Sequence, residues 1–341
     1  MPRASGSRVA KGLGRASVSN RCGGTAGKVP NLFVGIVSGL ASALLFYSAA
    51  HGGPLLRPFL LFVSPLPSLV AGFGWGWVTG VVGAVAGAAV AGALISSSVA
   101  LGFLLTLGVP SVIAAYLASL SRPDPNDANA REWYPAGRLI AGMALYAGAL
   151  PVLLLPLIGG SYEIMRPAMA EVLQQFSKRW LPPGTSLSDQ VLSEQTDWAL
   201  YLLPAGVAGQ WLMACALNIY LAGRIVLASG RLVRNWPEVP ALSYPPILAL
   251  ILGLAIVAAN TSGVFAVLGT GLFGALLCAY LLAGLAFAHF VSRRGAPWLV
   301  WVVYLGLLFL WPFFMPAIVL AGLFDSTLRI KQRLGWSSSS S

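Results

Sequence analysis

Residues 239–292 read VPALSYPPILALILGLAIVAANTSGVFAVLGTGLFGALLCAYLLAGLAFAHFVS, and these 54 residues contain no Asp, Glu, Lys or Arg. A second stretch, Leu32–Leu120, carries a single charged side chain, that of Arg57. About 20 consecutive apolar residues in a helix span the hydrocarbon of a bilayer, and a water-soluble core does not need such long continuous runs. The sequence therefore predicts an all-α, polytopic transmembrane helical bundle.

The composition agrees with this class. Hydrophobic residues make up 57% of the chain and charged residues only 9%, whereas soluble domains carry about 25% charged residues. The net charge of +11 would suggest nucleic acid for a soluble protein, but here the basic residues lie mainly in tails and short loops, where they orient membrane proteins. We therefore expect the lipid bilayer as the main partner and no nucleic acid.

Three segments follow from the charge pattern. Residues 1–30 contain six basic residues and no acidic residue. They lack the apolar core of a secretory signal, so they are predicted to form a disordered basic arm in the cytoplasm, near anionic lipid. Residues 31–334 form the transmembrane domain, and residues 335–341 form a low-complexity tail.

Apolar runs between charges and Pro/Gly clusters predict nine helices. Their ranges are 31–50, 55–73, 75–95, 99–120, 139–158, 198–227, 246–259, 264–291 and 298–323. The second helix contains Pro58, Pro65 and Pro67 and is expected to be kinked or broken, which neighbouring helices can compensate.

The loops predict the orientation. The basic arm places the N-terminus in the cytoplasm, and the acidic loop 161–197 is expected outside. Nine crossings would put the basic tail residues Arg329, Lys331 and Arg333 outside, against the positive-inside rule. We therefore expect eight full crossings with both ends inside; the incomplete one is the second helix, the helix 246–259 or the last helix.

One helix of the outer loop, residues 162–180, is predicted not to span. Its apolar side chains recur at helical spacing and form one stripe: Met165, Met169, Val172, Leu173, Phe176 and Trp180. This pattern is typical of an interfacial helix that rests on lipid headgroups. The alternative is a lid over an outward-facing cavity.

Small residues form stripes on two predicted helices. They are Gly35, Gly39 and Ala43 on the first helix, and Gly76, Gly80, Gly83 and Gly87 on the third. Such stripes let another helix approach closely and gain dispersion contacts. The helix that approaches belongs either to the same chain or to a membrane-protein partner.

Polar residues inside spans are the first candidates for function in a membrane protein. Gln210 and Asn218 are about 80° apart around one helix, and Asn260 ends the helix 246–259. They are candidate ligand-binding residues; the alternative is interhelical hydrogen bonding, worth about 0.6–2 kcal/mol each. Asp325 and Arg329, four residues apart, are expected to form an ion pair at a helix end.

Catalytic motifs are missing from the sequence. No acidic residue or lysine lies at mid-membrane depth, and no Walker loop, HExxH or GxSxG motif is present. The three cysteines, Cys22, Cys215 and Cys278, lie far apart and fit neither a disulfide framework nor a metal site. We therefore expect no enzyme activity, no metal and no cofactor.

Three further stretches carry a family resemblance. They are SPLP at residues 64–67 before the glycine-rich third helix, YLLAGLA with AHF at residues 280–290, and GLFD at residues 322–325 followed by Arg329 and Arg333. Over residues 31–334 the chain resembles the bacterial polytopic membrane proteins named after YybS. In that family the aromatic and acidic ending stands directly before the arginines, whereas Ser326, Thr327 and Leu328 intervene here.

Residues 31–228 are also distantly similar to the substrate-binding S subunits of energy-coupling-factor transporters. That resemblance implies a helical bundle with an outward-facing ligand cavity. It also implies that the bundle docks onto a partner through small residues of its first helix, here Gly35, Gly39 and Ala43. Taken together, these features predict a multi-pass protein of the bacterial inner membrane that binds a small solute in its bundle and takes part in its transport. The alternative is a non-transporting scaffold or assembly factor.

Overall fold

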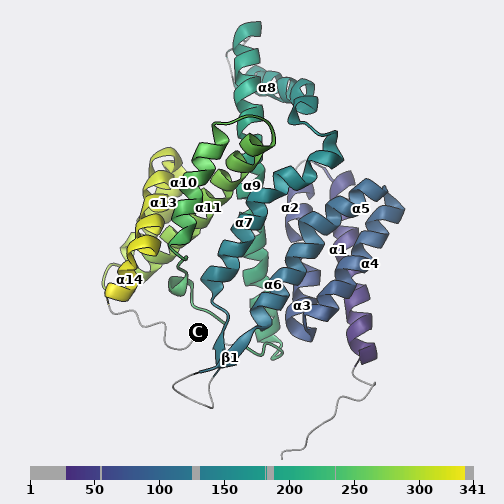
Figure 1. Ribbon diagram of the computed structural model, residues 1–341, viewed down its shortest axis with the longest axis vertical. Coiled ribbons are helices and arrows are strands. Elements are labelled where there is room, and N and C mark those ends of the chain that lie inside the picture. Colours follow the sequence, from purple (N-terminus) through teal and green to yellow (C-terminus); the bar gives the residue numbers. More distant parts are fainter. Residues whose placement is uncertain are drawn as a thin grey trace, which may run out of the picture.

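The computed structural model describes residues 28–53, 56–124, 131–180, 182, 188–234 and 236–334 (Figure 1). The predicted arm up to residue 27 and the tail 335–341 lie outside the described residues. The helices of the first half are α1 (Lys28–His51), α2 (Leu56–Val63), α3 (Leu66–Trp75), α4 (Trp77–Leu94), α5 (Ser97–Phe103), α6 (Val109–Ser119) and α7 (Ala136–Leu154). The second half contains α8 (Arg166–Trp180), α9 (Asp189–Ala228), α10 (Ile247–Ala259), α11 (Gly263–Ser292), α12 (Trp298–Phe309), α13 (Trp311–Leu328) and α14 (Ile330–Arg333).

Short elements join these helices. A π-helical turn, Leu104–Gly108, links α5 to α6, and 3-10 turns lie at Leu155–Ile158, Tyr162–Met165 and Val239–Ala241. The strands β1 (Ser121–Pro123) and β2 (Arg131–Trp133) form an antiparallel hairpin between α6 and α7. The architecture is thus the all-α bundle that the sequence predicts.

Eight segments of the described chain are long and apolar enough to cross a bilayer: Asn31–His51, Leu56–Trp75, Trp77–Leu94, Ser97–Ser119, Ala136–Ile158, Asp189–Ala228, Gly263–Ser292 and Trp311–Leu328. The helices α10 and α12 are apolar but have only 13 and 12 residues. At 1.5 Å per residue they are about 20 Å and 18 Å long, less than the roughly 30 Å of bilayer hydrocarbon. The count of eight candidate spans agrees with the number of full crossings expected from the sequence.

Two predicted helix boundaries are wrong. The range 298–323 is not one helix, because the chain breaks at Leu310 (φ −126°, ψ 33°), two residues before Pro312, whose ring would clash with a helical carbonyl. The range 198–227 is too short, because α9 begins nine residues earlier, at Asp189, with Ser188 as its N-cap. The prediction followed the run of apolar residues, so it did not include the polar first turns of α9.

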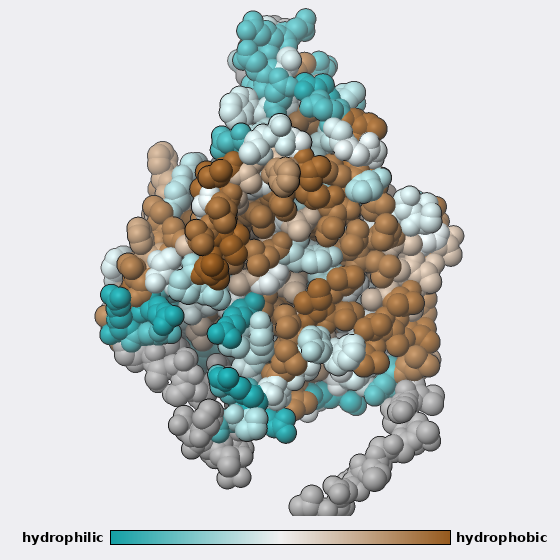
Figure 2. All heavy atoms as spheres, viewed as in Figure 1, coloured by the Kyte–Doolittle hydropathy of each residue, from teal (hydrophilic) through white to brown (hydrophobic). Residues whose placement is uncertain are grey.

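The helices form one elongated bundle (Figure 1). The α1–α6 group lies on one side, α10, α11 and α13 lie on the other, and α7 and α9 run between them. The helix α8 and the start of α9 project at one end, and the β-hairpin lies at the opposite end. Figure 2 shows apolar side chains in a broad band between these ends, with hydrophilic side chains gathered at the α8 end. This distribution fits a protein whose middle faces lipid.

The two glycine stripes pack against each other within the chain. A Cβ on Gly39 would overlap the carbonyl oxygen of Gly83, and one on Gly87 would lie 3.0 Å from the carbonyl oxygen of Gly39. A Cβ on Gly35 would lie 2.8 Å from the Thr79 carbonyl oxygen. Ala43 is also buried. The small residues of α1 are therefore occupied by α4.

Gly76 does not belong to this stripe, which corrects its predicted role. It forms the joint between α3 and α4 with φ +99°, a conformation that glycine adopts without strain. A Cβ at Gly76 would meet nothing within 4 Å. Gly80 packs instead on α3, since its Cβ would lie 3.6 Å from the Cα of Gly72.

Candidate functional site

The three polar residues singled out from the sequence do not share a cavity. Gln210 is exposed on α9, whereas Asn218 is completely buried. Asn260 is exposed at the end of α10, where its Nδ2 donates to the Ile256 carbonyl at 2.8 Å. None of the three lines any of the cavities described below.

Asn218 instead supports the broken second span. Pro65 has no N–H, so it cannot donate to the carbonyl of Leu61, and Ser64 Oγ donates to that oxygen at 2.7 Å. One residue further, Asn218 Nδ2 donates to the Phe62 carbonyl at 2.7 Å and to the Ala214 carbonyl of its own helix at 2.8 Å. Hydrogen bonds of this kind allow an irregular helix to persist where lipid offers no donors.

Side chains of other helices also donate hydrogen bonds to backbone carbonyls of the span α5–α6. Its π-helical turn precedes Pro110, and Trp211 Nε1 donates to the carbonyl of Thr106 at 3.0 Å. Tyr146 Oη donates to the carbonyl of Leu105 at 2.6 Å. Polar side chains of α7 and α9 therefore satisfy backbone carbonyls at two irregular spans. Trp211 and Tyr146 were not identified from the sequence, although Pro110 marks the span that needs them.

We expect Asn218→Leu to lower the free energy of unfolding by about 1–2 kcal/mol, because it removes both hydrogen bonds and leaves the Phe62 carbonyl without this donor. Gln210→Leu, on the same helix but exposed, is the matched control and is expected to change stability by less than about 0.5 kcal/mol. Thermal unfolding of the detergent-purified variants measures both. Equal stability of the two variants would contradict the structural role of Asn218.

A cavity of about 370 Å³ lies toward the hairpin end of the bundle, and we call it the hairpin-side cavity. Its lining is mainly apolar and comes from α3, α6, α7, α9, α11, α12, Arg234 and the segment 236–242. The lining residues include Phe73, Leu139, Ile140, Met213, Ala216 and Leu282. A concave, mostly apolar site with a few polar groups is the usual form of a small-molecule site.

The polar groups of the hairpin-side cavity lie on four segments: Tyr220 on α9, His289 on α11, Tyr304 on α12, and Arg234, Trp236 and Glu238 on the segment after α9. Arg234 is only 6% exposed, and burial lowers the pKa of its guanidinium. The Nε1 of Trp236 is buried without a hydrogen-bond partner. His289 Nε2 lies 3.2 Å from the Tyr304 hydroxyl, which joins α11 to α12. A buried indole N–H without an acceptor is uncommon.

A second cavity of about 370 Å³, the α8-side cavity, lies at the other end of the bundle. It is lined by the turn before α8, by the N-terminal half of α9 and by the start of α11. Arg166, the first residue of α8, pairs with Glu163 at 2.8 Å and with Asp197 of α9 at 2.6 Å. Hydrogen bonds to these two carboxylates raise the pKa of Arg166. These ion pairs fasten the start of α8 beside the cavity.

The rest of α8 does not cover this cavity. The apolar stripe includes Val172, Phe176 and Trp180, whose side chains are exposed, with Trp180 at 70%. The basic residues Lys178 and Arg179 occupy the last turn. An exposed apolar stripe beside basic residues favours the interfacial interpretation for most of the helix, and only the first turn lines the cavity.

The helices α9 and α11 border both cavities, and α7, which borders the hairpin-side cavity, packs tightly with them in the layer between the two. A Cβ on Gly274 of α11 would overlap the Ala205 carbonyl of α9, and one on Gly148 of α7 would lie 2.7 Å from the Cα of Leu272. Leu212 of α9 is fully buried in this layer. The close-packed layer therefore separates the two cavities.

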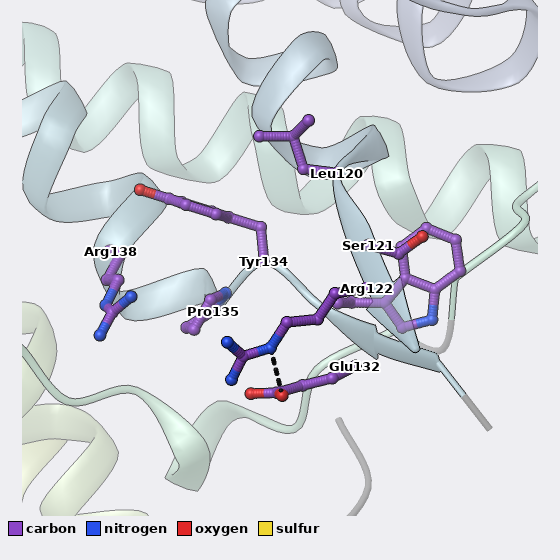
Figure 3. A pocket seen from close by; sticks show the side chains of 8 residues that line it. Leu120, Ser121, Arg122, Glu132, Tyr134, Pro135 and Arg138 are labelled. Carbon is purple, nitrogen blue, oxygen red and sulfur yellow. Dashed lines mark hydrogen bonds and ion pairs between the residues drawn. The ribbon is translucent and has the colours of Figure 1, made fainter. Parts of the chain in front are cut away.

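A polar cleft of about 280 Å³ lies at the hairpin itself (Figure 3). Arg122 Nε donates to Glu132 Oε2 at 2.7 Å across the hairpin, and this hydrogen bond raises the pKa of Arg122. Both side chains are well exposed, so solvent screens the pair and it contributes little to stability. The side chain of Arg138 stands apart from this pair.

The expected ion pair between Asp325 and Arg329 is wrong. Asp325 pairs with Lys331, whose Nζ lies 2.9 Å from Oδ2, and Asp325 Oδ1 accepts from the Lys331 backbone N–H at 3.1 Å. The reason is a left-handed turn at Arg329 (φ 53°, ψ 46°), which ends α13 and directs the next residues back over it. The regular helical spacing behind the prediction does not apply beyond that turn.

The described residues contain no group of three or more His, Cys, Asp or Glu side chains placed to hold a metal ion. A family model described as "Predicted membrane protein (DUF2232)" matches residues 40–326. Comparisons with curated proteins and with solved structures give no match.

Proposed function

The chain belongs to this family of predicted membrane proteins (DUF2232), and we propose that it binds a small amphipathic solute between α7, α9 and α11 and takes part in its transport. The observation that carries this proposal is the pair of cavities at opposite ends of these helices, separated by a close-packed layer. In alternating access a site between helices is exposed in turn to each side of the membrane, and the two cavities are the entrances that such a site would need.

The chemistry of the hairpin-side cavity narrows the class of solute. Its apolar lining accommodates an apolar body, while Arg234, Trp236, Glu238 and His289 make another part of the lining polar. A volume of about 370 Å³ fits a small metabolite rather than a macromolecule.

We place the hairpin end in the cytoplasm of a bacterium and the α8 end outside its inner membrane. Arg122, Arg138, Arg231, Arg293 and Arg294 support this orientation, because they belong to segments near the hairpin end and basic residues are retained on the cytoplasmic side. In this orientation the N-terminus is cytoplasmic, and the α8-side cavity faces outward.

The proposal includes a relationship of this chain to YybS-like proteins and a more distant one to S subunits of energy-coupling-factor transporters. The packing of Gly35 and Gly39 on α4 argues against docking of a coupling partner through these small residues. A partner, if the protein has one, would use another face of the bundle.

The test is a thermal-shift screen of the detergent-purified protein against vitamins and other small metabolites, with two variants beside the wild type. Ala216→Phe adds a ring inside the hairpin-side cavity, whereas Ala89→Phe adds the same ring on an exposed position of α4. A stabilising solute is expected to raise the melting temperature of the wild type and of Ala89→Phe, but not that of Ala216→Phe.

Two results would count against solute binding here. One is the absence of stabilisation of the wild type by any compound, and the other is full stabilisation of Ala216→Phe. Recovery of a stoichiometric membrane-protein partner by crosslinking, together with the first of these results, would favour a scaffold or assembly factor instead.

A further inference from the structure

A second polar cleft, of about 420 Å³, lies beside the hairpin cleft and borders the hairpin-side cavity, with which it shares Ala136 and Pro237. It is formed by the start of α7, the segment 240–246 and the turn between α13 and α14. Its charged lining residues are Glu132, Arg138, Asp325, Arg329 and Lys331.

Three of these five charged groups already form ion pairs within the protein. Asp325 and Lys331 are 1% and 4% exposed and form the buried ion pair described above. The Lys331 ammonium also donates to the carbonyls of Pro240 at 3.0 Å and Leu242 at 2.6 Å, so its donors are used. Glu132 is held by Arg122 across the hairpin.

The other two charged groups of the cleft are the guanidiniums of Arg138 and Arg329. In the part of the chain that the structure describes, neither Arg138 nor Arg329 has an ion pair or a side-chain hydrogen bond. Figure 3 shows Arg138 apart from the Arg122–Glu132 pair. The cleft therefore carries two positive charges that no described acidic residue balances.

The backbone of Arg329 adds a second argument. Its φ of 53° is the only positive φ of a non-glycine residue among those described. Glycine would make this turn without steric cost, and arginine does not. Strain kept at such a position suggests that the arginine side chain has a use, and Arg329 is one of the residues that line the cleft.

We propose that this cleft binds a phosphate group through Arg138 and Arg329. The planar guanidinium presents a fork of N–H donors that matches phosphate oxygens, so two guanidiniums at one cleft suit this anion. The cleft adjoins the end of the candidate span Trp311–Leu328, where phospholipid headgroups lie. The phosphate belongs either to an anionic phospholipid or to a water-soluble phosphate ester.

The experiment uses the full-length protein in detergent and two phosphate probes. Native mass spectrometry measures retention of phosphatidylglycerol against phosphatidylcholine, and calorimetric titration measures binding of glycerol 1-phosphate. The test variant is Arg138→Gln/Arg329→Gly. The control is Arg224→Gln/Arg333→Gln, which removes the same charge from two exposed arginines that do not line the cleft.

The test variant is expected to bind the phosphate probe about tenfold more weakly than the wild type, and the control less than twofold more weakly. Preferential retention of phosphatidylglycerol alone identifies a lipid headgroup, and binding of glycerol 1-phosphate alone identifies a soluble ester; binding of both supports a phosphate site open to either source. Equal weakening in test and control, or no binding of either probe to the wild type, overturns the proposal.

The glycine in the test variant separates binding from folding. Arg329→Gly removes the side chain and relieves the positive φ, so the single variant is expected to melt at or above the wild-type temperature while it loses phosphate binding. Loss of binding together with a lower melting temperature in this single variant would contradict the proposed role of the side chain.

Discussion

Lys331→Met is expected to lower the free energy of unfolding by about 3–5 kcal/mol, because breaking a buried ion pair leaves one charge without compensation. Here the charge left behind is the carboxylate of Asp325, which is 1% exposed. The carbonyls of Pro240 and Leu242 lose their donor at the same time. Thermal or denaturant unfolding in detergent measures the change.

Two further variants show whether the cause is the ion pair. Arg333→Met makes the same replacement in the same short helix but at an exposed position, and it is expected to change stability by less than about 0.5 kcal/mol. The double variant Asp325→Leu/Lys331→Met leaves no buried charge and is expected to be more stable than Lys331→Met alone. If Lys331→Met were no less stable than Arg333→Met, the pair would not hold the C-terminal turn in place.

Gly39→Leu is expected to destabilise the protein by about 3 kcal/mol or more, because added side-chain atoms overpack a closed interface. Even a Cβ at this position would overlap the Gly83 backbone of α4. Backbone cannot change rotamer as a side chain can, so α1 must move away from α4. Unfolding in detergent measures the loss, and crosslinking between cysteines placed on α1 and α4 reports the separation.

Gly142→Leu serves as the control for this prediction. A Cβ on Gly142 of α7 would meet nothing within 4 Å, and glycine costs a helix about 1 kcal/mol relative to alanine, so this variant should be as stable as the wild type or slightly more stable. A Gly39→Leu protein with wild-type stability would mean that the small face of α1 is open. It would then be free to bind a partner.

The spans themselves could be predicted from the sequence. The predicted range 264–291 lies within one residue of α11 at each end, and 31–50 lies within three residues of α1. The start of α9 was missed because residues 189–197 are polar and a hydrophobic run does not include them. The break before α13 had a signal in Pro312, but proline position alone does not say whether a span bends or ends.

The candidate site could be predicted less well from the sequence than the spans. Helical spacing showed that Gln210 and Asn218 share part of one helix, but not what lies opposite each of them. The Phe62 carbonyl that Asn218 binds is 156 residues away along the chain. The partner of Asp325 was missed in the same way, since the turn at Arg329 replaces helical spacing by a reversal of the chain.

The membrane class and the expected number of eight crossings followed from the sequence alone, because the free energy of placing a segment in lipid is nearly a sum over its own residues. The use of each polar or small residue was decided by the tertiary structure. Whether Asn218 faces a ligand or a carbonyl, and whether Gly39 meets α4 or a partner, depends on helices that are distant in sequence and adjacent only after packing. The two cavities and the cleft that contains Arg138 and Arg329 likewise form only where helices distant in sequence come together.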